Sequence, residues 1–188
     1  EDLRVRIDGV LAVLYLVFNE GYFASRSEMP ALRSELTTEA IRLTRLVREL
    51  LPDDAEVAGI LALMLLSEAR SPARITAKGE LVRLDEQDRG LWNRELIDEG
   101  LSLLDRLRGA VPGRYTLLAQ INAVHAAAVD AELTDWQRIV ELYEQLERVD
   151  PSPVVTLGKA VAIAERDSPQ QALVIVESLR DALADFHG

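Results

Sequence analysis

His125 is the first residue to consider for chemistry, because histidine is the side chain that changes charge near neutral pH. The chain contains two histidines, His125 and His187, and no cysteine. His125 stands in the run NAVHAAAV, and no zinc, phosphate-binding or nucleophile motif occurs in the sequence. One interpretation places His125 in a Ser-His-Asp site. The small apolar residues around it favour the other interpretation, a histidine packed in a helix. We expect no catalytic residue, no metal site, no cofactor and no enzymatic activity.

The segment DEQDRGLW, residues 85–92, combines charged and aromatic side chains. One interpretation pairs Asp88 with Arg89 to anchor an irregular segment, while Trp92 enters the core. The alternative makes the same groups a docking surface, since Arg and Trp are frequent interface anchors. Trp136, in DWQRI, has the same two interpretations.

Arg42 and Glu68 lie on strongly apolar segments. If they point inward they must be paired, and a groove between helices could then hold a ligand or peptide. Solvated outer faces are the simpler arrangement. A small-molecule pocket lined by Arg42, Glu68, Arg89 and Trp92 is therefore one functional hypothesis.

Asn19, Glu20 and Tyr22 surround Gly21 where an apolar segment ends. The cluster suits an active-site edge, a recognition signature or a helix end. We expect the last, with Gly21 in the left-handed conformation that closes a helix and Tyr22 packed back on it.

The elements that must position these residues are helices. Apolar residues recur every three or four positions, and no series of strands is evident. Helices are predicted at 3–18, 38–51, 53–70 and 91–107, with a connection at 22–36, the least helical stretch at 71–90, a break at Pro112-Gly113 and three or more helices after it. The run VAGILALMLL, residues 57–66, has no polar face and predicts a central helix surrounded by neighbours.

Helix starts are marked by capping residues. The sequence predicts them at Asp53-Asp54, Thr134, Ser152 and Ser168. The result is a single all-α domain over residues 1–188, made of about eight helices in stacked antiparallel hairpins. Ala160, Ala172 and Val176 have the spacing of a tetratricopeptide (TPR) unit, and Trp136, Ile139 and Tyr143 resemble the start of one, so the array is predicted to be TPR-like.

Composition limits the function classes. The 188 residues carry a net charge of -11 and a pI near 4.7, which disfavours direct contact with nucleic acid. No apolar run is long enough to span a membrane. The lack of cysteine is typical of a cytoplasmic protein. Because the sequence starts inside a helical pattern without methionine, we expect a fragment of a longer protein.

Several stretches occur together in an order that resembles one family. They are YLVFNEGYFAS, EAIRLTRLVRELLPDDAEVAGILALMLLSEAR, GELVRLDEQDRGLW, INAVHAAAV, TDWQRIVELYEQL and PSPVVTLGKAVAIA. The chain resembles the TPR-like C-terminal extension of a group of bacterial extracytoplasmic-function (ECF) sigma factors. Gly158 departs from the pattern, since relatives typically place an asparagine there.

The resemblance implies a regulatory or interaction module and transfers no catalytic residue. In that family the two sigma domains that bind RNA polymerase and read the promoter lie upstream. The implied partners are those upstream sigma domains, RNA polymerase, or a small YCII-type protein encoded nearby. The resemblance thus implies a role in transcription initiation without direct DNA contact by this segment.

Overall fold

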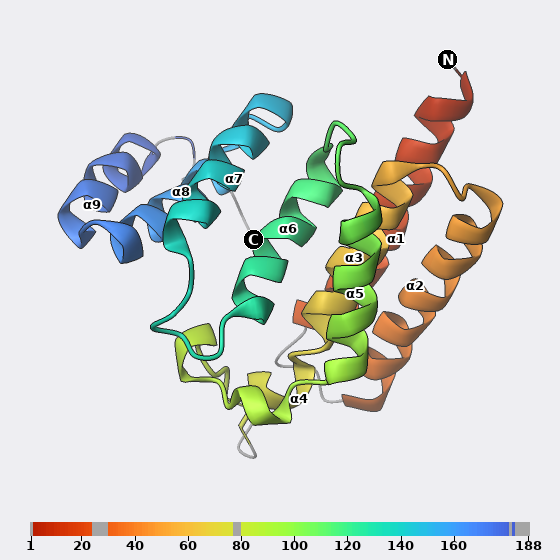
Figure 1. Ribbon diagram of the computed structural model, residues 1–188, viewed down its shortest axis with the longest axis horizontal. Coiled ribbons are helices and arrows are strands. Elements are labelled where there is room, and N and C mark those ends of the chain that lie inside the picture. Colours follow the sequence, from red (N-terminus) through yellow and green to blue (C-terminus); the bar gives the residue numbers. More distant parts are fainter. Residues whose placement is uncertain (1, 24–29, 77–79, 181, 183–188) are drawn as a thin grey trace.

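The computed structural model describes residues 2–23, 30–76, 80–180 and 182, and over these residues the fold is all-α (Figure 1). The described part contains nine α-helices and two short 3₁₀ helices, η1 and η2, where the sequence predicted about eight helices. The α-helices are α1 (Asp2–Phe23), α2 (Pro30–Leu50), α3 (Ala55–Glu68), α4 (Ser71–Arg74), α5 (Arg94–Arg106), α6 (Arg114–Ala127), α7 (Trp136–Val149), α8 (Pro153–Arg166) and α9 (Pro169–Ser178). The 3₁₀ helices are η1 (Leu84–Glu86) and η2 (Arg89–Leu91).

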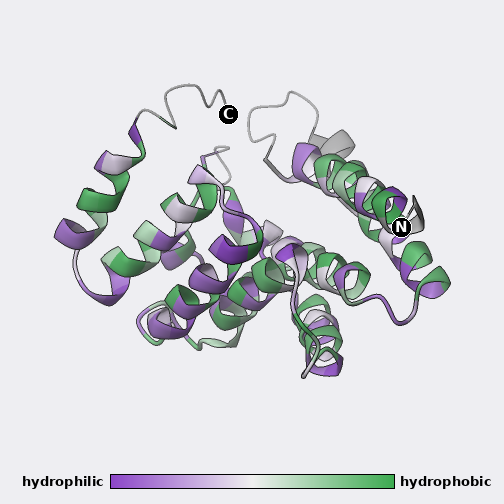
Figure 2. Cartoon of the chain, turned by 90° about the horizontal axis from the view of Figure 1, so that it is seen from above, coloured by the Kyte–Doolittle hydropathy of each residue, from purple (hydrophilic) through white to green (hydrophobic). Residues whose placement is uncertain are grey.

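The helices follow a curve, from α1 and α2 at one end to α8 and α9 at the other (Figures 1 and 2). Most consecutive long helices pack against each other, and α3 also packs against α1, α5 and α6. Among the described residues the nearest approach to a strand is one isolated antiparallel bridge between Ile75 and Leu81. No helix in the described ranges combines the length and apolar character needed to cross a bilayer.

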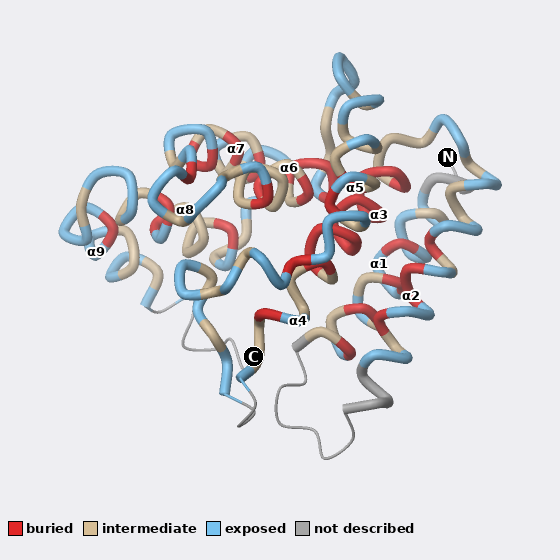
Figure 3. The backbone as a smooth tube through the Cα atoms, turned by 60° about the horizontal axis from the view of Figure 1, so that its bottom comes forward, coloured by how far each residue is buried: buried red, intermediate tan, exposed pale blue. Residues whose placement is uncertain are grey.

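Helix α3 lies at the centre of the larger core, as the sequence predicted. Every residue from Val57 to Ser67 is buried, and the tube in Figure 3 is red along this helix. A helix that is apolar on all sides must be enclosed by other elements to remove that surface from water. Here α1, α2, α5 and α6 enclose it.

The contact between α3 and α6 depends on two residues of α3. A Cβ on Gly59 would lie 2.7 Å from the backbone nitrogen of Thr116, so glycine permits the close approach of the helices. The Glu56 carboxylate accepts hydrogen bonds from the backbone amides of Gly113, Tyr115 and Thr116, at 3.2, 2.8 and 3.1 Å. These amides are at the amino end of α6, where helix amides lack partners within the helix. Glu56 therefore caps the helix that packs across α3.

The predicted end of the first helix is wrong. Helix α1 continues through Asn19, Glu20 and Gly21 to Phe23, and α2 begins at Pro30, earlier than predicted. Gly21 does not have positive φ, since Gly109 is the positive-φ residue in the described ranges. Gly21 is buried within the helix and does not form the predicted left-handed helix end.

The predicted caps are confirmed in part. Asp54 caps α3 by accepting from the amides of Glu56 and Val57, and Ser152 caps α8. Helix α9 starts after Ser168, but the serine side chain makes no capping hydrogen bond. Thr134 is not the cap of α7: Asp135 accepts from the amide of Arg138 at 2.9 Å, and Thr134 is buried.

The small residues of the TPR-like pattern lie where α8 meets α9. Ala160 and Ala172 are both buried, and the two helices pack against each other. Val176 is half-buried. The spacing therefore identified this contact correctly, because small side chains on facing helices let the backbones approach.

Candidate functional site

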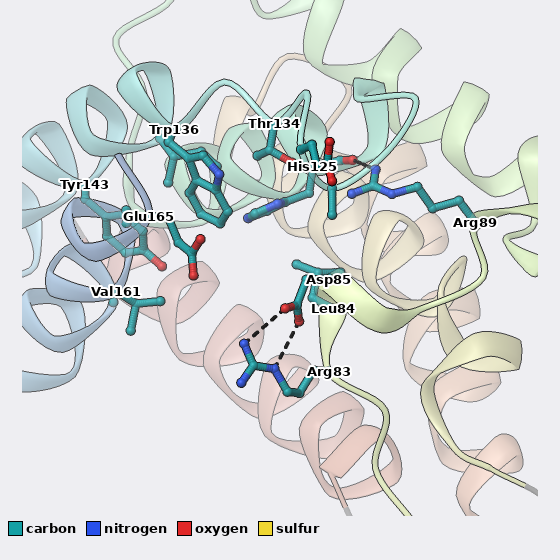
Figure 4. Close-up of a pocket in the computed structure, with 15 residues that line it drawn as sticks. Arg83, Leu84, Asp85, Arg89, His125, Thr134, Trp136, Tyr143, Val161 and Glu165 are labelled. Atoms are coloured by element: carbon teal, nitrogen blue, oxygen red, sulfur yellow. Dashed lines mark hydrogen bonds and ion pairs between the residues drawn. The ribbon is translucent and has the colours of Figure 1, made fainter. Parts of the chain in front are cut away.

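A cavity of about 770 Å³ lies among residues 83–89, the end of α6 and helices α7 and α8 (Figure 4). Its walls include the aromatic rings of Trp136 and Tyr143 and the imidazole of His125. Its volume is in the range of small-molecule sites. It is therefore the candidate functional site.

His125 lies on the cavity wall near the end of α6. Its ring packs edge-on against Trp136, with ring centroids 5.3 Å apart. Burial and the positive charges of Arg70 and Arg89 lower the pKa of His125 to about 4, so the imidazole is neutral at pH 7. The described residues form no hydrogen bond with the imidazole, so no nucleophile is paired with it, as a Ser-His-Asp site would require.

Arg89 is not paired with Asp88, contrary to the first interpretation of DEQDRGLW. Its Nη1 donates to the carbonyl oxygens of His125 and Ala128, at 2.6 and 2.7 Å, and Asp88 instead accepts from the amide of Gly90. The carbonyls at the end of α6 lack partners within the helix and carry partial negative charge, so a guanidinium is well suited to them. Arg89 therefore ties the irregular segment to α6.

The two tryptophans have different environments. Trp92 is 3% exposed and packs in a small core with Ile97 and Ala126, and the Arg89 guanidinium lies 4.7 Å from the centre of its ring. Its entry into the core is confirmed. Trp136 is half-buried and forms part of the cavity wall.

Tyr143 and Gly158 form the wall between α7 and α8. A Cβ on Gly158 would lie 2.6 Å from the Tyr143 hydroxyl and 2.8 Å from two of its ring carbons. The tyrosine thus occupies the space that a side chain at position 158 would need. Burial raises the pKa of Tyr143, so its hydroxyl is protonated at neutral pH.

The hypothetical pocket of Arg42, Glu68, Arg89 and Trp92 does not form. Arg42 lies on the exposed face of α2 and pairs with Glu39 at 2.7 Å. Glu68 lies at a second cavity of about 170 Å³, where burial raises its pKa and hydrogen bonds with Ser71 and Thr37 oppose that rise. Arg89 and Trp92 contact each other, but neither Arg42 nor Glu68 lines a cavity with them.

Asn19, Glu20 and Tyr22 also lie away from the main cavity. Tyr22 stacks on Phe18, with ring centroids 5.5 Å apart, as expected, and the Arg74 guanidinium lies 3.8 Å from the centre of its ring. Asn19 forms a hydrogen bond with the Tyr15 side chain, and Glu20 is exposed. Of the three, Tyr22 connects the end of α1 to Arg74 of α4.

Charged residues at the cavity were missed by the sequence analysis. Arg83 and Asp85 form an exposed ion pair at 3.0 Å. Glu165, from α8, and Glu132 complete the charged lining. No motif marks these residues, because they converge from segments as far apart in the sequence as Arg83 and Glu165. The described residues contain no cluster of three or more His, Asp or Glu side chains that could hold a metal ion.

Comparison with known proteins gives two matches. Residues 6–108 match the model of a family of unknown function, DUF6596. The chain is 45% identical over 186 residues to the uncharacterized protein R00370 of Rhizobium meliloti (strain 1021). That alignment covers 98% of this chain and 44% of the relative, so the chain spans less than half the length of the curated relative that it matches. No solved structure matches.

The matched range runs from α1 through α5 and includes the central helix α3, the Asn19–Tyr22 cluster and Arg89 with Trp92. It ends before α6 and therefore before His125 and the α7–α8 side of the cavity. Since it covers more than half of the sequence, the chain belongs to the DUF6596 family.

Proposed function

We propose that this chain is the regulatory, protein-interaction part of an ECF-type RNA polymerase sigma factor. It would modulate transcription initiation through contacts with upstream sigma domains, RNA polymerase or a separate regulator. The ordered set of sequence segments from YLVFNEGYFAS to PSPVVTLGKAVAIA carries this proposal. A cytoplasmic location follows from it.

Three further observations support the proposal. The curved row of helices offers an extended surface, of the kind that helical arrays use to bind proteins. The net charge of -11 suits contact with basic protein surfaces better than with nucleic acid. The Rhizobium meliloti relative is more than twice as long as the matched part, which leaves room for further domains in such proteins.

We infer that the chain has no enzymatic activity of its own. The low pKa of His125 makes it a weak general base at neutral pH, and the described residues supply it with no hydrogen-bonded nucleophile. A role in binding accounts for the cavity without a reaction.

Transcription in vitro tests the main proposal. The full-length protein would be compared with a version truncated just before Glu1, on its cognate promoter with purified RNA polymerase. Higher activity after truncation would make the domain an inhibitor, and loss of activity with folded sigma domains would make it a required contact. Unchanged activity, or a full-length gene without sigma domains upstream, would contradict the proposal.

Partner identity needs a separate experiment. The chain would be immobilised and exposed in turn to the isolated sigma domains, to core RNA polymerase and to the small YCII-type protein. Binding of one of these, weakened by added salt as expected for an acidic surface, would identify the partner. Failure of all three to bind would count against regulation by protein contact.

A small-molecule-sensing role is the second candidate, favoured by the cavity of about 770 Å³. A ligand that binds only the folded protein must raise its stability. A thermal-shift screen in which no metabolite raises the Tm would contradict this role.

A further inference from the structure

The cavity beside His125 contains more negative charge than its own cations neutralise. Of its lining cations, Arg83 pairs with Asp85, and Arg89 donates to two backbone carbonyls at the end of α6. Glu132 and Glu165 also line the cavity, and the described residues form no ion pair with either. Two carboxylates therefore remain available to a ligand.

Glu165 is the better placed of the two. Figure 4 shows its carboxylate directed into the cavity, between the rings of Trp136 and Tyr143 on one side and the Arg83–Asp85 pair on the other. Arg83 and Glu165 interact only through space. The charge of Glu165 raises the pKa of Arg83, but less than the hydrogen bond with Asp85 and the charges of Asp85 and Glu86 do. Arg83 is largely exposed and already bonded to Asp85, so it does not neutralise Glu165.

The aromatic wall of the cavity, like its carboxylates, suits a cationic ligand. The faces of tryptophan and tyrosine rings attract cations, and the attraction is stronger where water is excluded. A guanidinium or amidinium is flat, weakly hydrated and able to donate two parallel hydrogen bonds to one carboxylate, whereas an ammonium is a strongly hydrated point charge. Flat rings beside a carboxylate therefore favour a planar cation.

We propose that this cavity binds a planar organic cation, with its charge beside Glu165 and against the rings of Trp136 and Tyr143. The inference does not depend on the sigma-factor function proposed above. The same chemistry is available from a free aromatic amidine or guanidine and from an arginine side chain of a partner protein.

The orientation of the ligand follows from the other end of the cavity. Arg70 and Arg89 are close enough to His125 to lower its pKa, so that end disfavours a second cation. The neutral imidazole of His125 and the hydroxyl of Thr134 can instead meet an uncharged polar part of the ligand. The charge of the ligand is therefore directed to the α8 side.

NMR titration of the 15N-labelled chain tests the proposal. The two tryptophans give two indole N–H signals: Trp136 reports on the cavity, and the buried Trp92 serves as an internal control, with a Trp136→Phe variant to assign them. The probes are benzamidinium, uncharged benzamide and benzoate, which share one shape and differ in charge. N-acetyl-arginine amide and its uncharged citrulline counterpart form a second matched pair.

We expect a cationic probe to shift the Trp136 signal with saturation, and the uncharged and anionic probes to bind about tenfold more weakly or not at all. Glu165→Gln should weaken the binding of the cationic probe by about tenfold. Glu177→Gln removes the same charge from the exposed surface of α9 and should leave binding unchanged. Tighter binding of benzamidinium would indicate a free aromatic cation, and tighter binding of the arginine compound would indicate a partner's side chain.

Three results would overturn the proposal. The first is binding of benzoate or benzamide that is as tight as the binding of benzamidinium. The second is the absence of any Trp136 shift with either cation at about 10 mM, where even a weak millimolar complex would be mostly formed. The third is full retention of cation binding by Glu165→Gln.

Discussion

The guanidinium of Arg89 donates a hydrogen bond to the backbone carbonyl of His125 at 2.6 Å, and its charge lowers the pKa of the same residue's imidazole. Arg89 thus closes the end of α6 and also adds to burial and to the charge of Arg70 in lowering the pKa of a histidine on the cavity wall. The second effect can be measured separately from the first.

Replacing Arg89 by methionine should raise the pKa of His125 from about 4 towards the ordinary 6.5, because a nearby positive charge is removed while most of the burial remains. An NMR titration of the imidazole signals measures this change. Arg83→Met is the matched control: Arg83 lines the same cavity but is not among the causes of the His125 shift. An unchanged or lower pKa of His125 in Arg89→Met would show that the charge of Arg89 does not contribute to it, leaving burial and Arg70 as its causes.

The stability of the protein should fall in mild acid because of His125. Its pKa is lower in the folded chain, about 4, than in the unfolded chain, about 6.5, so the unfolded state takes up the proton first as the pH falls below 6.5. The resulting loss in the free energy of unfolding is complete near pH 4 and amounts to about 2 kcal/mol at pH 5. Above pH 6.5 the residue contributes no pH dependence.

Urea denaturation at pH 7 and pH 5, for the parent chain and for His125→Gln, measures that loss. The difference between the two pH values should be about 2 kcal/mol smaller in the variant. A His187→Gln variant controls for the other histidine, which lies outside the described residues. Equal pH dependence in the parent chain and His125→Gln would exclude His125 as the cause.

Glu56→Ala should destabilise the fold by about 2–4 kcal/mol, because three amides at the start of α6 lose their acceptor and the Thr116 hydroxyl loses the nearer of its two acceptors. Chemical denaturation gives the free energy of unfolding. Glu99→Ala removes a carboxylate from an exposed pair with Arg45 and should cost less than about 1 kcal/mol. Similar costs for the two variants would mean that the Glu56 bonds do not contribute as inferred.

Gly158→Ala should lower stability, although alanine normally stabilises a helix interior by about 1 kcal/mol relative to glycine. The reason is the contact of 2.6–2.8 Å between the added Cβ and the Tyr143 side chain. In a Tyr143→Ala background that contact is absent, so the same substitution should become stabilising. A double-mutant cycle measures the change of sign. A stabilising effect of Gly158→Ala in both backgrounds would show that Tyr143 moves aside without cost.

The sequence by itself determined the fold class and many of the helices. The continuous apolar run at residues 57–66 required a helix enclosed on all sides, and Asp54 and Ser152 marked helix starts, because these signals act within one turn of chain. Ala160 and Ala172 also indicated the contact between α8 and α9. These are local or periodic patterns, which a sequence displays directly.

Tertiary structure alone decided the partners of the charged side chains. Glu56, in the first turn of α3, caps α6. Arg89 was expected to pair with its neighbour Asp88 but bonds to carbonyls 36 and 39 residues away. Gly21 looked like a helix end but lies within α1. The cavity combines Arg89, Trp136 and Glu165 from three segments. Long side chains select partners by distance in space, and that distance is fixed only when the helices pack.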